Sequence, residues 1–129
     1  MKLSVSNFAW PQQEALWCYE QLACRDIQGI EITPTKIFGS DWEITSEKVQ
    51  QLKETLSQFD LTISSLQGIT FGKDDIALIG QQSNNLQEHL KRVADITVIL
   101  EADVAVFGAG RLRNVQCMIA KNCSPFFRT

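Results

Sequence analysis

The sequence lacks most of the residue patterns that mark common enzyme classes. It contains no Walker motif, no GxGxxG, no GxSxG and no HExxH, so nucleotide binding and serine hydrolysis are disfavoured. Its only histidine, His89, lies beside the apolar stripe of a predicted helix, and we expect it on the helix surface. The four cysteines show neither CxxC spacing nor nearby histidines, so we expect buried or idle thiols rather than a zinc site or a disulfide framework. They are Cys18, Cys24, Cys117 and Cys123.

The chain also lacks a basic excess and a long apolar run. A formal net charge of -3 and a pI near 5.1 give no basic field that could neutralise the phosphates of a nucleic acid. No segment approaches the roughly 18 apolar residues of a membrane span, and the N-terminal apolar stretch is too short for a signal peptide. We therefore expect a cytoplasmic protein with a small-molecule partner, and no nucleic-acid or membrane partner.

What the chain does contain is a regular alternation of strand and helix patterns, within a length typical of one domain. Four stretches alternate apolar residues with small or polar ones, which predicts strands. They cover residues 2–7, 27–32, 61–66 and 103–107. Three segments between these strands repeat apolar residues at helical spacing, which predicts three helices.

Each predicted helix has a start signal and an apolar stripe. Pro11 opens the first helix, and Thr45 or Ser46 caps the second. Ser83 caps the third helix, which ends near Ala102. The first stripe is Ala15, Leu16, Tyr19, Leu22 and Ala23. The second is Val49, Leu52, Leu56 and Phe59, and the third is Leu86, Leu90, Val93, Ala94 and Thr97.

Strict alternation of strands and helices predicts parallel strands joined by right-handed crossovers, and hence an α/β fold. In each strand, large apolar residues take one parity, while the other parity carries mostly Ser, Thr, Gly, Glu or Ala. Strands of a doubly wound open sheet are covered on both faces and read as nearly continuous apolar runs. The observed pattern therefore favours the wall of a barrel.

The stretch from Ile27 to Gly39 is the centre of this organisation. Glu31 lies at the C-terminal end of a strand, on the face opposite to Ile30 and Ile32. Pro34 biases the residue before it to extended geometry, so we expect the strand to end there and a loop to present Thr35 and Lys36. In α/β proteins this end of the strands is where ligands usually bind.

Several residues near the predicted strand ends are candidates for binding a substrate. Glu31 can hold a substrate hydroxyl or support a metal, whereas a salt bridge to Lys36 or to an arginine would make it structural. Arg111 and Arg113 follow a glycine-containing loop and can bind phosphate or carboxylate, the alternative being solvated surface residues. Gln67 can bind a hydroxyl, and aromatic rings at this rim can stack on a sugar or pack the loop. The substrate-binding candidates are Trp10, Glu31, Lys36, Gln67, Arg111 and Arg113, and the other rings are Phe38 and Trp42.

Four stretches at the predicted strand ends resemble a known family. They are Leu3-Ser-Val-Ser-Asn-Phe-Ala-Trp, Gly29-Ile-Glu-Ile-Thr-Pro-Thr-Lys-Ile, Leu66-Gln-Gly-Ile-Thr-Phe-Gly and Val106-Phe-Gly-Ala-Gly-Arg. These stretches look like the first four strand ends of the xylose isomerase-like TIM barrels, the sugar phosphate isomerase/epimerase group. The resemblance covers residues 1–114 and implies that they form the N-terminal (β/α)4 half of a TIM barrel, with about four strands and three helices.

The same resemblance implies a complete barrel that holds a divalent metal and moves protons next to a sugar's carbonyl group. The family's metal ligands, Glu, Asp, His and Glu, lie mainly on the later strands, so we expect no metal or other cofactor in this chain. We expect a truncated isomerase or epimerase that is inactive by itself and takes a sugar or sugar phosphate as ligand. The alternatives are a non-catalytic binding module and a relative of the endonuclease-IV-like metal-dependent hydrolases.

Residues 115–129 do not continue the repeat. They contain two of the four cysteines, no acidic residue, and Pro125 where a fourth helix is expected. We expect that the reading frame was shifted or the chain cut near Val115, the alternative being a natural C-terminal extension. With the later strands missing, the outer edges of the first and fourth strands are unpaired, and we expect self-association through these edges.

Overall fold

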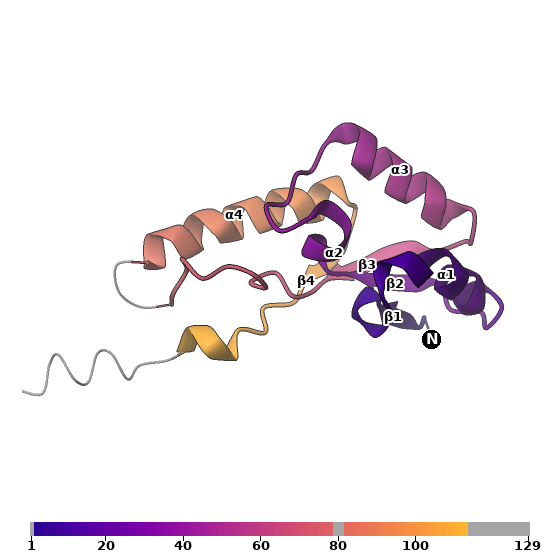
Figure 1. The fold of residues 1–129 in the computed structure, drawn as a ribbon, viewed down its shortest axis with the longest axis horizontal. Helices are drawn as coiled ribbons and strands as arrows, with labels where there is room; N and C mark the ends of the chain where they lie inside the picture. The colour runs from indigo at the N-terminus through magenta and orange to yellow at the C-terminus, as the bar shows by residue number, and fades with distance from the viewer. Residues whose placement is uncertain (1, 79–81, 114–129) are drawn as a thin grey trace, which may run out of the picture.

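The computed structural model of the chain describes residues 2–78 and 82–113. Its sheet has four parallel strands whose order in the sheet follows their order in the chain (Figure 1). The strands are β1 (Ser4–Ser6), β2 (Gly29–Ile32), β3 (Thr62–Leu66) and β4 (Val104–Ala105). The predicted α/β fold of parallel (β/α) repeats is thus confirmed, and this four-stranded sheet is not closed. The predicted tail of residues 115–129 lies outside the described residues.

The three predicted helices are present as α1 (Ala15–Ala23), α3 (Ser46–Ser57) and α4 (Ser83–Ile99). A further short helix, α2 (Pro34–Phe38), replaces the loop that the sequence predicts after β2. Pro34 is compatible with this helix because it occupies the first turn, where a proline removes no internal hydrogen bond. Three single turns of 3₁₀ helix complete the described elements: η1 (Asn7–Ala9), η2 (Gln12–Glu14) and η3 (Gly110–Arg113).

The helix starts agree with the sequence in one case and differ in two. Thr45 caps α3, because its Oγ1 accepts a hydrogen bond of 3.3 Å from the backbone N–H of Lys48. Pro11 does not open α1: its backbone is extended, and η2 lies between it and the helix. Ser83 is not the cap of α4 but its first residue, and Gln82 precedes the helix without a capping side-chain hydrogen bond.

The buried faces of two helices also differ from the predicted stripes. Leu16 was expected in the core, but 61% of its surface is exposed, whereas Cys18 is buried. The buried residues of α1 are Ala15, Cys18, Tyr19 and Leu22, which are separated by three, one and three positions. This spacing defines one face of the helix and leaves Leu16 on the outer side. In α4, His89 and Ile96 take the buried places that the sequence assigned to Leu90 and Ala94. The predicted stripe of α3 is confirmed.

All three long helices end in the same turn. Each is followed by an acidic residue in the left-handed backbone region, with φ between 54° and 56°. The N–H of this residue bonds the carbonyl three residues back, and the next N–H bonds the carbonyl five residues back. This pair of hydrogen bonds is the Schellman arrangement, which satisfies the last carbonyls of a helix and turns the chain away. The three acidic residues are Asp26, Asp60 and Glu101.

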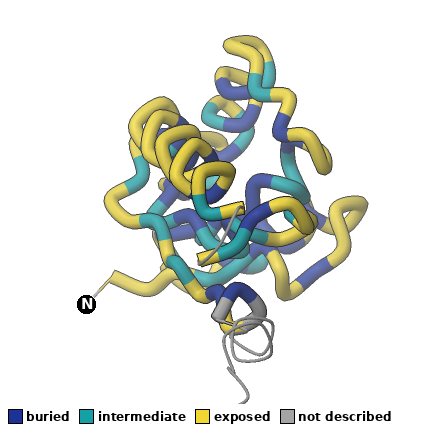
Figure 2. Tube along the Cα trace, turned by 90° about the vertical axis from the view of Figure 1, so that its left-hand side faces the viewer, coloured by how far each residue is buried: buried dark blue, intermediate teal, exposed yellow. Residues whose placement is uncertain are grey.

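The core lies between one face of the sheet and the three long helices. Ile30, Ile32 and Leu66 are fully buried and belong to the same apolar cluster as the inner side chains of α1, α3 and α4. In Figure 2 the buried residues gather between strands and helices, while the outer sides of the helices are exposed. The residues of opposite parity, such as Ser4 and Glu31, lie on the other face of the sheet and are exposed or half-buried.

Gly29 allows β1 and β2 to approach each other closely. A Cβ atom at this position would lie 2.9 Å from the Cβ of Ser4 and 3.2 Å from the carbonyl oxygen of Leu3. The first distance is shorter than real Cβ contacts allow and the second is tight, so a larger residue would require Ser4 and the backbone of β1 to shift.

None of the described helices has the length and apolar character needed to cross a membrane.

We predict that Leu22→Ala destabilises the protein far more than Leu16→Ala, although both residues lie on α1. Leu22 is 8% exposed and its loss leaves a cavity, which should lower the free energy of unfolding by about 2–5 kcal/mol. The same change at the exposed Leu16 should alter it by less than about 0.5 kcal/mol. Denaturant unfolding followed by circular dichroism measures both values, and similar losses for the two variants would contradict the observed orientation of α1.

Candidate functional site

The C-terminal ends of the four strands lie along one edge of the sheet because all the strands are parallel. This edge is the usual place for ligands in folds of this kind. The first residues after β1, β2 and β3 are Asn7, Thr33 and Gln67. All three are polar, although the strands that lead to them contribute apolar residues to the core. This edge of the sheet is therefore the best candidate position for a functional site.

Glu31 lies one residue before the end of β2, on the face that points away from the helices. Its carboxylate oxygen Oε2 accepts a hydrogen bond of 3.0 Å from the hydroxyl of Ser65 on β3. The sequence analysis considered a salt bridge with Lys36 as a structural role for Glu31. Among the described residues, the half-buried carboxylate makes no such salt bridge. The described ion pairs join other residues, Lys48 with Glu43 and Lys53 with Glu101. Glu31 is thus held by a neutral hydroxyl and remains able to accept further hydrogen bonds.

A register shift between β2 and β3 creates this contact. Ile30 is paired with Ile63, but Glu31 is paired with Ser65, so Ser64 is the extra residue of a β-bulge. The hydroxyl of Ser64 donates a hydrogen bond of 3.2 Å to the carbonyl of Ile30. Without the bulge, simple alternation would place Ser65 on the helix side of the sheet. The bulge therefore turns a hydroxyl toward the carboxylate.

Further hydroxyl and amide groups continue this polar surface on the same side of the sheet. The hydroxyl groups of Ser4 and Ser64 lie 2.6 Å apart and share a hydrogen bond. The side-chain amide of Gln67 donates to the hydroxyl of Ser6. We call this surface the inner polar face. Its members are Ser4, Ser6, Glu31, Ser64, Ser65 and Gln67.

Asn7 and Thr33 connect the ends of β1 and β2 beneath this surface. Asn7 is 1% exposed, and its Oδ1 accepts a hydrogen bond of 2.9 Å from the backbone N–H of Thr33. The Nδ2 of Asn7 and the hydroxyls of Thr33 and Thr35 are buried and have no hydrogen-bond partner within the described part of the chain. A buried polar group without a partner costs roughly 1–3 kcal/mol, so these three groups lower the stability of this end of the sheet.

Lys36 and Trp10, two of the predicted binding residues, make contacts within the protein. The ammonium group of Lys36 donates hydrogen bonds to the carbonyls of Asn7, at 2.7 Å, and of Trp10, and it lies 5.5 Å from the ring centroid of Phe8. Trp10 is 7% exposed and packs edge to face on Tyr19. Lys36 thus joins α2 to the turn after β1, and Trp10 belongs to the core. The other two aromatic candidates, Phe38 and Trp42, are buried as well.

The two arginine candidates follow β4. Arg111 and Arg113 belong to the backbone turn η3, and their side chains lie outside the described part of the structure. Of the six predicted binding residues, the structure therefore brings two together on the inner polar face, Glu31 and Gln67. Sequence reasoning missed Ser6 and Ser65 as members of this surface. Alternation could have indicated Ser6, but no local signal indicated the bulge that orients Ser65.

His89 is not a surface residue, contrary to the sequence-based expectation. It is 9% exposed, its Nε2 contacts the backbone carbonyl of Ile69 at 2.5 Å, and its ring centroid lies 5.0 Å from that of Trp42. The loop after β3 folds over α4 and covers this part of the helix. The histidine therefore anchors the loop to the helix, a contact between residues far apart in the sequence.

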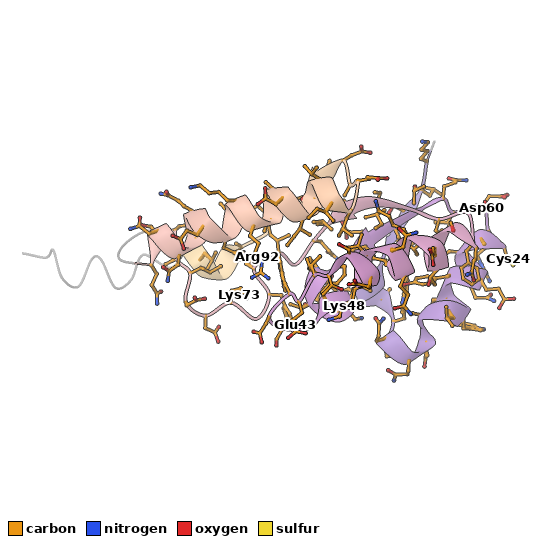
Figure 3. The ribbon with its side chains drawn as sticks, turned by 90° about the horizontal axis from the view of Figure 1, so that it is seen from above. Cys24, Glu43, Lys48, Asp60, Lys73 and Arg92 are labelled. Carbon is orange, nitrogen blue, oxygen red and sulfur yellow. The ribbon has the colours of Figure 1, made fainter. Side chains whose placement is uncertain are left out.

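A polar cavity of about 360 Å³ lies beside His89, between this loop and α4. Arg92 forms part of its wall and donates hydrogen bonds of 3.0 Å and 2.6 Å to the carbonyls of Asp41 and Trp42. Figure 3 shows Arg92 and Lys73 near each other beneath α4. His89 and Arg92 both bond to backbone carbonyls of other segments, which gives each side chain a structural role. The lining residues are Lys73, Asp75, Ile76, Asn85, Glu88, His89 and Arg92.

The resemblance to metal-dependent isomerases raises the question of a metal. Within residues 2–78 and 82–113, no three His, Cys, Asp or Glu side chains gather in a group that could hold a metal ion. Glu31 accepts a hydrogen bond from the hydroxyl of Ser65, and the amide of Gln67 belongs to the same face, a set that suits a polar organic ligand better than a divalent cation. The described residues therefore do not fit a metal site by themselves.

We predict that Lys36→Met lowers the stability of the fold. Methionine keeps most of the apolar stem but removes the ammonium group and leaves the carbonyls of Asn7 and Trp10 without their donor. A hydrogen bond to a charged group contributes about 1.5–3 kcal/mol, so we expect a loss of at least about 1.5 kcal/mol. The control is Lys48→Met, which removes a surface ion pair and should cost less than about 1 kcal/mol. Equal effects in urea unfolding would contradict the structural role of Lys36.

Comparisons of the chain with family models, curated proteins and solved structures found no match. The function is therefore inferred from the chain's own residues and their geometry. In that geometry, the inner polar face at the strand ends is the best candidate for a binding site, and the likeness to sugar isomerases at four strand ends stays an expectation.

Proposed function

We propose that this chain provides the substrate-holding half of a sugar isomerase or epimerase site. The observation that carries the proposal is the position of Glu31: a half-buried carboxylate at the C-terminal end of a parallel strand, held by the hydroxyl of Ser65. Gln67 and Ser6 extend the same surface with an amide and a hydroxyl. A ligand rich in hydroxyl groups matches this set, because each of its hydroxyls can donate to the carboxylate and accept from an amide.

The proposed role is binding and orientation rather than a full reaction. An isomerase needs a group that polarises the carbonyl and a group that moves the proton. Glu31 can accept a proton or a hydrogen bond from a substrate hydroxyl, but the described residues provide no metal cluster to polarise the carbonyl. We therefore propose that the chain by itself binds the sugar without converting it, and that conversion needs the strands that complete a barrel.

We predict that Glu31→Gln weakens sugar binding at least about tenfold. Glutamine preserves the shape and can still accept from Ser65, but it removes the charge, and hydrogen bonds to charged groups contribute about 1.5–3 kcal/mol. The measurement is a titration with a panel of sugar phosphates and their parent sugars, followed by NMR chemical shifts. Glu20→Gln, at an exposed position on α1, is the matched control and should leave binding unchanged. Equal binding by both variants would refute the role of Glu31.

We also predict that the chain binds a sugar phosphate more tightly than the parent sugar. Arg111 and Arg113 follow β4 in the sequence, and guanidinium groups bind phosphate through paired hydrogen bonds. Replacing both with alanine should remove the preference for the phosphate and leave the affinity for the parent sugar nearly unchanged. If the wild-type chain binds both ligands equally, or if the double variant keeps the preference, the assignment of the arginines is wrong.

A further inference from the structure

Both outer edges of the sheet carry backbone groups that point away from their neighbours within the described residues. On β1, the carbonyl of Leu3 accepts from the N–H of Gly29, so the backbone of Ser4, one residue on, points outward. On β4, the N–H of Val106 donates to the carbonyl of Leu66, so the backbone of Ala105 points outward. Each edge can therefore accept another parallel strand.

Both edge strands lack most of the features that normally prevent such pairing. Exposed edges in monomeric proteins are usually blunted by very short strands, by proline, by lysine or other charges, or by bulges. β1 and β4 are short, with three and two residues, but their sequences, Ser-Val-Ser and Val-Ala, contain no proline and no charge. The bulge of this sheet lies at its centre, between β2 and β3. Large apolar side chains are also exposed at both edges: Leu3 is 48%, Val104 is 52% and Val106 is 45% exposed.

The order of the strands determines which partner fits both edges at once. The described sheet has the order β1-β2-β3-β4, and each strand pairs in parallel with the next. The outer edge of β4 can therefore pair with another parallel strand, just as β3 pairs with β4. The free outer edge of β1 can supply that strand. A second copy of the chain, rotated by 180° about an axis along the strands, places its β1 beside β4 and its β4 beside β1. Both new pairs are parallel.

We propose that two copies of this chain close into one eight-stranded parallel barrel with two-fold symmetry. An axis perpendicular to the strands would pair only one edge, in antiparallel fashion, and would leave the other edge open, whereas the axis along the strands leaves none. In the closed dimer, both inner polar faces line one barrel, and each copy contributes one Glu31 to the shared rim. The proposal depends only on the sheet edges, so it stands or falls independently of the proposed sugar binding.

The oligomeric state and the amide protection of the full chain test this proposal together. Light scattering at roughly tens of micromolar should give twice the chain mass of 14.5 kDa, and dilution should lower it, because dimerisation follows mass action. Hydrogen exchange should show that the outward amides of Ser4 and Ala105 are protected in the dimer and exchange faster on dilution. A dimer formed through the helices would leave these two amides unprotected.

Two variants separate edge pairing from other contacts. Val104→Lys combined with Val106→Lys places charges on the edge and should convert the dimer to a monomer with an unchanged circular dichroism spectrum. Val98→Lys, at a position on α4 that is 76% exposed, is the matched control and should remain dimeric. A monomeric wild-type chain, unprotected edge amides in a dimer, or a dimer that survives the double substitution would overturn the proposal.

Discussion

The structure depends on the complete burial of one face of β2. This strand is hydrogen-bonded on both sides, by β1 and by β3, and its isoleucines Ile30 and Ile32 are fully buried against the helices. Because strand residues alternate between faces, this burial forces Gly29 and Glu31 onto the opposite face. Gly29 then permits the close approach of β1, and Glu31 meets the hydroxyl of Ser65. The position of the candidate site is thus a consequence of how the core is filled.

The strands and the long helices could be predicted because they depend on patterns of apolar and polar residues within short segments. Alternation within short stretches indicated all four strands, and the spacing of apolar residues indicated the three long helices. The cap of α3 was narrowed to Thr45 or Ser46, because a hydroxyl side chain before an amphipathic segment satisfies a free N–H of the first turn, and the structure shows that Thr45 is the cap. The error at Leu16 has a local cause as well: several apolar residues in one turn of α1 allow two stripes, and only packing selects one of them.

The candidate site was less predictable because its details come from distant segments. The bulge at Ser64 depends on how two strands pair, and it reverses the side on which simple alternation places Ser65. His89 contacts the carbonyl of a loop residue that lies 20 positions earlier in the chain, and Lys36 donates to carbonyls that lie 29 and 26 positions before it. Polar side chains whose partners are backbone carbonyls leave no pattern in the sequence, so their structural roles appear only in three dimensions.

The repeated turn after α1, α3 and α4 shows how each helix passes to the next strand without a glycine. Asp26, Asp60 and Glu101 adopt nearly the same φ, and the same pair of hydrogen bonds closes each turn. Glycine is the residue that usually occupies this left-handed position at the end of a helix. In this chain an acidic residue holds it each time, at a cost in backbone free energy that the packing of the helices on the sheet offsets.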